Sequence, residues 1–481
     1  MAKKIMIQGT CSNAGKSLVA AGLCRIFAQD GYKVCPFKAQ NMALNSYITK
    51  DGLEMGRAQA VQAEACGIEP DVRMNPILLK PTSKQGSQAI INGEVEGTYG
   101  AKDFHEKKKD FRNDVKAAFD SLSEEYDIIV IEGAGSPAEI NLKKNDLANM
   151  GTAELVDAPV LIVGDIDRGG VFAALAGTLL LFDEKERARV AGVIVNKFRG
   201  DVEILKPGLD MLEDIIKKPV LGVIPYTKVD IDDEDSLSEK LSSRKEQGAI
   251  DIAVIKLPRM SNFTDFNPLE YIDSVTVRYV DSKDDFGEPD MVIIPGTKNT
   301  MEDLIWMREN GLEARVLKAA SEDVPVFGIC GGYQILGQKL EDPEGIEHGG
   351  ELNGMKLLPH NTVFSGEKVR KSETGTLAAV DGIFADLSGK TYTGYEMHMG
   401  TSKASGNIIN QGNVYGTYIH GIFDEEEITK VILDKLTEKK GLNKEDFKAF
   451  DIKAYKESQY DLLADVLRES LDMEYIYRVL R

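Results

Sequence analysis

The sequence predicts an α/β protein of two domains, each built on a mostly parallel sheet wound with helices on both faces. A chain of 481 residues is too long for a single hydrophobic core. Short, continuously apolar segments alternate with helix-length segments in the first half, a pattern typical of parallel strands buried on both faces. The predicted strands there are Lys4–Gln8, Asp127–Ile131, Val160–Val163, Val190–Val195 and Val220–Ile224. Each half also contains a glycine-rich turn between a strand and a helix.

Changes in composition along the chain predict the domain boundaries. The first domain covers residues 1–225, and a polar stretch over 226–250 is predicted to be a linker. The second domain covers 251–481, with strands near Met291–Ile294 and Val324–Ile329 and a helical tail beyond Glu425. Five apolar residues recur in this tail at helical spacing and predict a packing stripe: Leu462, Leu463, Val466, Leu467 and Leu471.

Composition excludes several classes of function. The formal net charge of −20 argues against a nucleic-acid partner, because phosphate binding requires a basic face. No run of eighteen apolar residues predicts a membrane span, and the first residues enter a strand in place of a signal peptide. The five cysteines have neither metal-ligand spacing nor the pattern of a disulfide framework. We therefore expect a cytoplasmic protein.

The most informative motif lies around Cys330. The apolar run Val324-Pro-Val-Phe-Gly-Ile ends in Cys330-Gly331-Gly332, and a helix-compatible segment follows. A strand that turns sharply into a helix, with glycine on both sides of one nucleophilic side chain, is a nucleophile elbow. The turn directs backbone N–H groups at the sulfur, which favours the thiolate and forms an oxyanion site. Cys330 is therefore the predicted nucleophile, and Gly331 a predicted oxyanion donor.

A phosphate-binding loop is predicted at the other glycine-rich turn. Gly9-Thr10-Cys-Ser-Asn-Ala-Gly15-Lys16-Ser17 follows the first strand and opens a helix over Leu18–Ala28. Five residues, one more than the common pattern, separate the two glycines. Glu132 ends another apolar strand, at the sheet edge where ligands of open α/β sheets bind. The predicted ATP-binding residues are Gly9, Thr10, Gly15, Lys16 and Ser17, and Ser17 and Glu132 are the predicted Mg²⁺ ligands.

A cysteine nucleophile requires a base, and two histidines compete for that role. His420 ends a strand-like segment about ninety residues after the elbow, in Thr417-Tyr-Ile-His420-Gly. This arrangement resembles the class I glutamine amidotransferases, and the resemblance implies that His420 is the base. His398 remains a competing base. The catalytic triads of these amidotransferases consist of Cys, His and a Glu two positions after the His. This chain has Ile422 at that position, so Glu396 and Asp424 are the candidates for the acidic residue of the triad.

Longer segments widen the resemblance to nearly the whole chain. The long loop beginning Gly9-Thr10 is similar to that of dethiobiotin synthetase, which phosphorylates a carboxylate or carbamate. From Gln8 to Asp424 the chain resembles the cobyrinate amidase family of cobalamin biosynthesis. The segments that carry this resemblance include Gln40-Asn-Met-Ala-Leu-Asn-Ser46, Gly56-Arg-Ala-Gln-Ala-Val-Gln-Ala-Glu-Ala65, Asp165-Ile-Asp-Arg-Gly-Gly-Val-Phe172, Ser261-Asn-Phe-Thr-Asp265, Tyr395-Glu-Met-His398 and Thr417-Tyr-Ile-His420.

The resemblance implies both a fold and a reaction. It implies an N-terminal P-loop domain and a C-terminal domain like those of the class I glutamine amidotransferases. ATP, with Mg²⁺, phosphorylates the peripheral carboxylates b, d, e and g of adenosylcobyrinic acid a,c-diamide. Ammonia released from glutamine then converts each acyl phosphate to an amide, which gives cobyric acid. By similarity, Gly296 supplies a second oxyanion N–H and Asn196 reads adenine.

Two other functions remain open from the sequence. The first is a related amidoligase of the same architecture, such as cobyrinic acid a,c-diamide synthase. The second is a P-loop regulatory ATPase whose degenerate amidotransferase domain serves only for binding. The intact Cys330–His420 pair argues against the second, since a binding module has no need of an elbow nucleophile.

Overall fold

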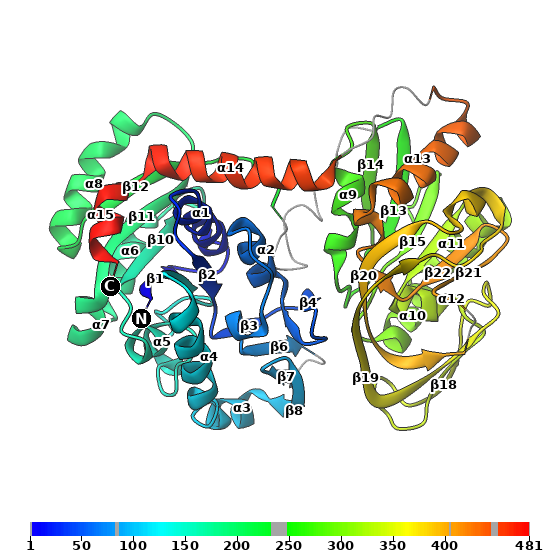
Figure 1. Ribbon diagram of the computed structural model, residues 1–481, viewed down its shortest axis with the longest axis horizontal. Helices are drawn as coiled ribbons and strands as arrows, with labels where there is room; N and C mark the ends of the chain where they lie inside the picture. The colour runs from blue at the N-terminus through cyan, green and yellow to red at the C-terminus, as the bar shows by residue number, and fades with distance from the viewer. Residues whose placement is uncertain (1, 82–85, 232–247, 404–405, 444–450, 481) are drawn as a thin grey trace. The chain divides into compact units, whose positions relative to one another are not determined.

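The computed structural model describes residues 2–81, 86–231, 248–403, 406–443 and 451–480. These residues form two compact units, each of which has its own sheets and helices (Figure 1). Unit 1 comprises Met1–Ala43, Glu54–Glu234 and Ala454–Arg481, and unit 2 comprises Leu44–Leu53 and Asp235–Lys453. Most of the predicted linker, residues 232–247, lies outside the described residues.

Unit 1 is built on a fully parallel six-stranded sheet in the order β12-β11-β10-β1-β9-β2. All five strands predicted in the first half belong to this sheet. The strand bounds are β1 (Lys3–Gly9), β2 (Val34–Phe37), β9 (Ile128–Glu132), β10 (Val160–Asp165), β11 (Val190–Phe198) and β12 (Val220–Pro225). Because the strands are parallel, their carboxyl ends meet at one edge, and this edge carries both the end of β1 and Glu132 at the end of β9.

Helices cover both faces of this sheet. Ile5 and Ile7 of β1 point into the core on one face, which also receives α1 and the C-terminal helices. On the other face, Gly164 of β10 leaves space for Leu175 of α6. The helices of the N-terminal part are α1 (Lys16–Gln29), α2 (Arg57–Ala65), α3 (Ala101–Lys107), α4 (Arg112–Glu125), α5 (Met150–Leu155), α6 (Val171–Leu180), α7 (Glu184–Arg189) and α8 (Val202–Ile216). The predicted doubly wound architecture is therefore confirmed for unit 1.

A second, smaller sheet of unit 1 has the order β3-β6-β7-β8. Its strands are β3 (Gln40–Met42), β6 (Ile77–Pro81), β7 (Gly86–Ile91) and β8 (Glu94–Gly100). The short strand β5 (Glu54–Gly56) precedes α2, and Glu54 forms a buried ion pair of 2.9 Å with Lys80 of β6. This sheet follows β2 directly in the chain, so β3, which contains Asn41, begins two residues after Lys38.

The C-terminal tail packs in unit 1, which corrects the predicted domain boundary of 251–481. Leu463 and Leu467 of α14 (Ile452–Ser470) lie in the same buried core as Ile5 and Ile7, together with Ile476 of α15 (Met473–Val479). Gly22 of α1 makes room for Leu467, whose Cδ1 atom would lie 2.3 Å from a Cβ at that position. The amphipathic stripe predicted a packing face but could not indicate which domain it covers.

Ion pairs fix the tail helix along α1. Arg25 pairs with Asp461 at 2.8 Å, and Arg468 pairs with Asp30 at 2.7 Å. These charges lie at the rim of the apolar contact, where exposed pairs add little stability. Buried leucines therefore supply most of the stabilisation of the contact between α1 and α14.

Unit 2 contains a six-stranded sheet in the order β14-β13-β15-β16-β22-β21, parallel except for the edge strand β21. Its strands are β13 (Ile250–Ile255), β14 (Val275–Val280), β15 (Met291–Ile294), β16 (Val326–Ile329), β21 (Ile408–Gln411) and β22 (Val414–Thr417). The helices are α9 (Asn267–Glu270), α10 (Thr300–Glu309), α11 (Leu312–Ser321), α12 (Gly331–Leu336) and α13 (Glu426–Lys440). Strands at Met291–Ile294 and near Val324–Ile329 were predicted, and both are present.

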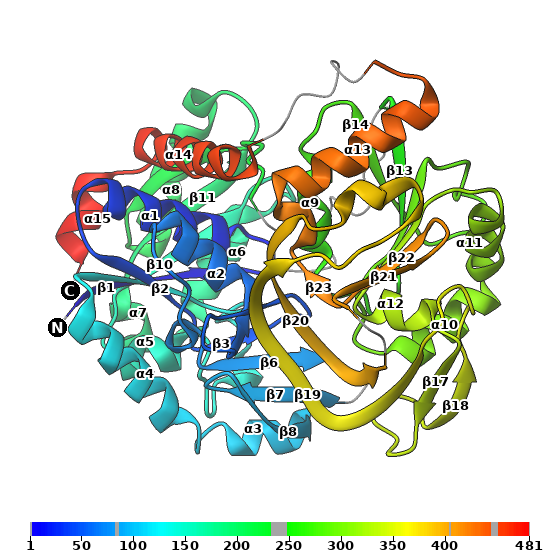
Figure 2. The same ribbon diagram turned by 45° about the vertical axis from the view of Figure 1, so that its right-hand side comes forward.

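A second sheet of unit 2, with the order β18-β17-β19-β20-β23, contains the long antiparallel pair β19 and β20 (Figure 2). Its strands are β17 (Lys339–Asp342), β18 (Gly350–Asn353), β19 (Asn361–Thr376), β20 (Thr391–Ser402) and β23 (Ile419–His420). β23 pairs with β20 so that His420 lies opposite Tyr395. The two sheets of unit 2 are thus joined through the short connection from β22 to β23.

Residues Leu44–Leu53, which include β4 (Ser46–Ile48), belong to unit 2 although their chain neighbours on both sides belong to unit 1. Ile48 forms a small buried cluster with Tyr395 and Met397 of β20. The amide of Asn262 donates to the backbone carbonyl of Ser46 at 3.1 Å. We call this segment the crossover segment. Among the described residues, no helix is both long enough and apolar enough to span a bilayer.

We expect Leu467→Ala to destabilise unit 1 by about 3 kcal/mol, because it removes a side chain that is only 1% exposed from the α1–α14 contact. Leu462→Ala is the matched control: Leu462 lies on the same helix, is 40% exposed and should cost less than about 1 kcal/mol. Hydrogen exchange of the α1 and α14 amides at increasing urea measures the free energy of unfolding of unit 1 in both variants, separately from that of unit 2. Equal protection in the two variants would contradict this account of the tail.

Candidate functional site

The predicted elbow is present at the end of β16. Cys330 has φ 51° and ψ −108°, an uncommon backbone conformation for a residue with a side chain, and α12 begins at the next residue. Its N–H donates to the carbonyl of Thr417 at 2.9 Å. A Cβ at Gly332 would lie 1.9 Å from the carbonyl oxygen of Ile294, so only glycine allows this approach. The flanking glycines are therefore required by backbone packing that holds the cysteine at the helix N-terminus.

The loop after β15 borders the elbow. A Cβ placed on Gly331 would lie 3.0 Å from the backbone nitrogen of Thr297. A Cβ on Gly296 would lie 3.1 Å from Cε1 of His420, so this glycine sits directly beside the imidazole. Gly331 and Gly296 thus flank the same small region as Cys330 and His420. Their role as oxyanion donors remains a prediction.

His420 ends β23 and is 1% exposed. Its Nδ1 lies 2.7 Å from Oδ2 of Asp265, and its ring stacks on Tyr395 with 5.2 Å between the ring centroids. Burial by itself lowers the pKa of this imidazole, but the negative charge of Asp265 and then that of Cys330 outweigh burial and raise the pKa to about 10. The interaction with Cys330 places His420 next to the predicted nucleophile.

The competing base, His398, has other partners. Its Nδ1 lies 2.8 Å from the carbonyl oxygen of Gly400, and its ring stacks on Tyr418 at a centroid distance of 3.7 Å. Its Nε2 lies 3.5 Å from Glu396, whose carboxylate also pairs with a lysine of β19. His398 therefore packs as part of β20, and the geometry favours His420 as the base.

The carboxylate that contacts His420 was not among the candidates from sequence. Within the described residues Glu396 pairs with Lys371 and His398, and Asp265 occupies the position at the imidazole. Asp265 lies in the turn η4 (Phe263–Phe266), 155 positions before His420 in the chain. The segment Ser261-Asn-Phe-Thr-Asp265 is one of those that carry the family resemblance, which is the available signal in the sequence, but no spacing rule links it to the histidine.

The phosphate-binding loop of unit 1 has the predicted context, between β1 and α1. Gly15 has φ +99° and precedes α1, which begins at Lys16. The Lys16 ammonium donates to the carbonyls of Cys11 and Gly135, both at 3.0 Å. The amide of Asn196 donates to the carbonyl of Ala14 at 2.9 Å, so this side chain supports the loop. Its predicted contact with adenine remains a prediction.

Glu132, at the end of β9, collects polar groups from three elements. Its Oε1 accepts hydrogen bonds from the Ser17 hydroxyl at 2.8 Å and from the Lys38 ammonium at 2.9 Å. Its Oε2 accepts from the amide of Gln62 on α2 at 2.6 Å. The side chains of Lys38 and Glu132 are 3% and 0% exposed, so their charges compensate each other in a buried place.

The residues at Glu132 fit a Mg²⁺ ion bound mainly through a nucleotide. A hydroxyl and a carboxylate only 2.8 Å apart, both hard oxygen donors, suit an ion that takes one or two protein ligands and completes its shell with phosphate and water. No cluster of three or more His, Cys, Asp or Glu side chains in the described parts of the chain forms a self-sufficient metal site. The Ser17–Glu132 pair is thus consistent with the predicted metal ligands.

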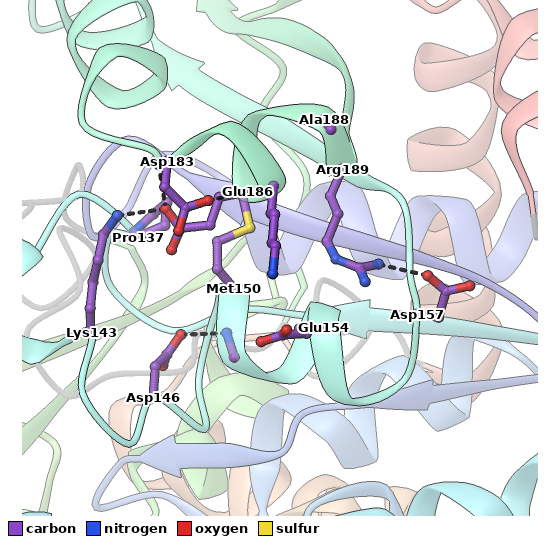
Figure 3. A pocket seen from close by; sticks show the side chains of 12 residues that line it. Pro137, Lys143, Asp146, Met150, Glu154, Asp157, Asp183, Glu186, Ala188 and Arg189 are labelled. Carbon is purple, nitrogen blue, oxygen red and sulfur yellow. Dashed lines mark hydrogen bonds and ion pairs between the residues drawn. The ribbon is translucent and has the colours of Figure 1, made fainter.

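A surface pocket of unit 1 lies apart from these residues. Its volume is about 460 Å³, and the loop after β9, α5 and α7 line it (Figure 3). Lys143 pairs there with Glu186, and Arg189 pairs with Asp157 at 2.7 Å. None of the site residues predicted from sequence lines this pocket. Two of its cations are thus paired with carboxylates of the lining, and we assign the pocket no function.

Comparisons with known proteins agree with the division into two units. Residues 5–238 match the family described as the CobQ/CobB/MinD/ParA nucleotide binding domain. Residues 251–428 match the family described as the CobB/CobQ-like glutamine amidotransferase domain. The two predicted architectures are therefore shown: a mostly parallel nucleotide-binding domain and a glutamine amidotransferase domain.

Curated relatives match the chain over its full length. Cobyric acid synthase of Ruminiclostridium cellulolyticum is 61% identical over 100% of this chain and 97% of its own length. Cobyric acid synthase of Lachnoclostridium phytofermentans is 57% identical over 100% of this chain and 99% of its own length. The same enzyme of Clostridium botulinum strain ATCC 19397 is 53% identical over 99% of both chains. With these identities over the whole sequence, the chain belongs to the cobyric acid synthase family.

Proposed function

We propose that the chain is an ATP- and glutamine-dependent amidoligase that forms cobyric acid. Its substrate is adenosylcobyrinic acid a,c-diamide, and the carboxylates b, d, e and g become amides. The observation that carries this proposal is the presence of two complete candidate centres in one chain of this family: the Cys330–His420 elbow in unit 2 and the Lys16–Ser17–Glu132 loop site in unit 1. Two such centres suit a reaction in which unit 2 releases ammonia from glutamine and unit 1 activates the carboxylate that the ammonia attacks.

The residues of unit 2 support hydrolysis of glutamine. The Cys330 thiolate attacks the carboxamide carbon, and the charge on the carbonyl oxygen is stabilised by N–H groups near Gly331 and Gly296. His420, as the imidazolium, gives its proton to the departing ammonia and leaves a thioester on Cys330. His420 then removes a proton from water, which attacks the thioester and releases glutamate.

The residues of unit 1 support activation of the acceptor. A substrate carboxylate oxygen attacks the γ-phosphorus of ATP, ADP leaves, and an acyl phosphate forms. Lys16 exchanges its contacts with loop carbonyls for phosphate oxygens and offsets their charge as the bond to ADP breaks. Ammonia then attacks the acyl carbon, and phosphate departs with the bonding pair. Mg²⁺, held by Ser17 and Glu132, would neutralise phosphate charge.

Lys38 is suited to the same centre. Its ammonium is buried and depends on Glu132 for charge compensation. Lys38 lies beside Glu132, which with Ser17 would hold Mg²⁺, so its positive charge would be close to the bound phosphates. A phosphorylated intermediate, which carries additional negative charge, would gain most from this cation.

The reaction itself tests the proposal. Adenosylcobyrinic acid a,c-diamide is incubated with the protein, MgATP and glutamine, and the corrinoid is followed by mass spectrometry. We expect stepwise conversion of carboxylates to carboxamides that stops after the fourth. An unchanged corrinoid together with glutamate release would contradict the substrate and keep the amidotransferase.

We expect Cys330→Ala to lower glutamine-dependent amidation by about 1,000-fold or more while amidation with ammonium salts persists, because the substitution removes the nucleophile and leaves unit 1 intact. Cys66→Ala is the matched control, since burial raises the pKa of that thiol well above its usual value and keeps it protonated. Loss of both activities in Cys330→Ala would show that the two centres are not separable.

We expect Lys16→Ala to lower amidation by about 100-fold or more with either nitrogen source, because the phosphate oxygens lose the loop ammonium that offsets the charge of the transferring phosphoryl group. Lys143→Ala, in the surface pocket, is the control and should keep full activity. Equilibrium binding of a nucleotide analogue separates loss of binding from loss of transfer. Undiminished synthesis by Lys16→Ala would exclude the assigned ATP loop.

A further inference from the structure

We propose that Asp265 is a positioning residue for glutamine hydrolysis, which holds the ring of His420 and its protonated form beside Cys330. This inference rests on the proposed function, because it takes His420 to be the base that serves Cys330. Asp265 acts through the histidine and has no assigned contact with the substrate.

Both carboxylate oxygens of Asp265 are engaged by the segment that carries the histidine. Oδ2 lies 2.7 Å from Nδ1 of His420, and Oδ1 accepts the N–H of Gly421 at 3.0 Å. Two contacts to consecutive residues fix the carboxylate in its plane and fix the imidazole relative to the backbone. Asp265 is only 5% exposed, so water does not compete for these contacts.

The turn that carries Asp265 is itself fixed. Asn262 adopts the left-handed conformation with φ 53°, and its carbonyl accepts the N–H of Asp265 at 3.0 Å. The Asn262 amide also donates to the backbone carbonyl of Ser46 and to the hydroxyl of Tyr395, whose ring stacks on His420. Asp265 therefore approaches His420 from a turn that is anchored on two sides.

The chemistry of the pair explains why a carboxylate is needed. A hydrogen bond from Nδ1–H to Asp265 leaves Nε2 as the ring nitrogen that exchanges a proton with the thiol. The resulting imidazolium is buried, and a buried cation without a counter-ion is strongly disfavoured. The raised pKa of His420, to about 10, agrees with a carboxylate that outweighs the cost of burial.

The surroundings of His420 contain few other charges. Cys330 faces it from the elbow, the phenol ring of Tyr395 from β20, and the Gly296 loop from β15. On the adjoining η6 (Ile422–Asp424), the Asp424 carboxylate lies near Gly421, where a Cβ on that glycine would be 3.3 Å from Oδ2. The position two after the histidine is Ile422, which is fully buried and apolar. Among the described residues, Asp265 is thus the carboxylate in hydrogen-bond contact with the imidazole.

The test compares the wild type with Asp265→Asn, which keeps the size of the side chain and removes its charge. Alkylation of Cys330 by iodoacetamide is followed across pH by peptide mass spectrometry. Without the negative charge the pKa of His420 falls, the imidazolium that stabilises the thiolate is less populated, and the thiolate forms at higher pH. We expect the alkylation midpoint to rise by about one pH unit or more and kcat for glutamine hydrolysis to fall about 100-fold with a small change in KM.

Two controls separate this role from a structural one. Asp251→Asn removes another buried carboxylate of unit 2, which binds Arg278 at 2.7 Å, and should leave the alkylation midpoint unchanged. Amidation with ammonium salts should persist in Asp265→Asn. If Asp265→Asn does not fold, Asp265→Ser is measured instead, with the same expected shift. A midpoint equal to that of the wild type, with kcat within twofold, would overturn the inference.

The same experiment distinguishes failure of this inference from failure of the proposed function. If the wild type releases no glutamate, or if Cys330→Ala still does, then the assigned amidotransferase chemistry is wrong. The alkylation midpoint of Cys330 does not depend on glutamine turnover. It therefore reports the link from Asp265 to His420 in either case.

Discussion

Both candidate centres depend on the same constraint, a parallel strand that turns into a helix with no space for a side chain. In unit 2 a Cβ on Gly332 would meet the carbonyl oxygen of Ile294 at 1.9 Å, and in unit 1 a Cβ on Gly15 would meet the amide of Asn196 at 2.0 Å. Each glycine thus lets the turn pack against another strand of the same sheet. The turn then presents a helix N-terminus, which lies directly after Cys330 in unit 2 and directly after Gly15 of the predicted phosphate-binding loop in unit 1.

The buried ion pairs at the two centres are better explained by chemistry than by stability. Lys38–Glu132 and His420–Asp265 both have side chains that are less than 5% exposed. Removing charges from water costs several kcal/mol per ion, and a well-formed pair roughly offsets that cost without much net gain. A pair of apolar residues would fill the same space at lower cost. What the pairs provide is a charge held in a fixed place, as the chemistry proposed for each centre requires.

Local sequence patterns predicted the parts of the molecule that local physics determines. Continuous apolar runs located the parallel strands, and the spacing of glycines around Cys330 and Lys16 located the two turns, because backbone approach excludes other residues there. The domain of the tail was not predictable, since the stripe on α14 reports an apolar face without its partner. That partner is a core containing Leu23 and Ile26 of α1, more than 400 positions earlier in the chain.

The carboxylate beside His420 illustrates the same limit. A rule of spacing places the acid two positions after the histidine, and that position holds Ile422 in the core. The fold instead brings Asp265 to the imidazole from a turn after β13, which no periodicity in the sequence marks. The sequence alone predicts that a carboxylate contacts the histidine, and the tertiary structure determines which of several carboxylates does so.

The surroundings of His420 also depend on the crossover segment, which lies outside residues 251–428 of the amidotransferase domain. The turn that holds Asp265 is anchored through Asn262 to Ser46, and Ile48 packs with Tyr395 against which His420 stacks. Ser46 and Ile48 are joined by the chain, in both directions, to β3 and β5 of unit 1. The position of the imidazole therefore rests partly on residues whose neighbours belong to the nucleotide-binding unit, so the geometry of the glutaminase centre is not a property of its own domain sequence alone.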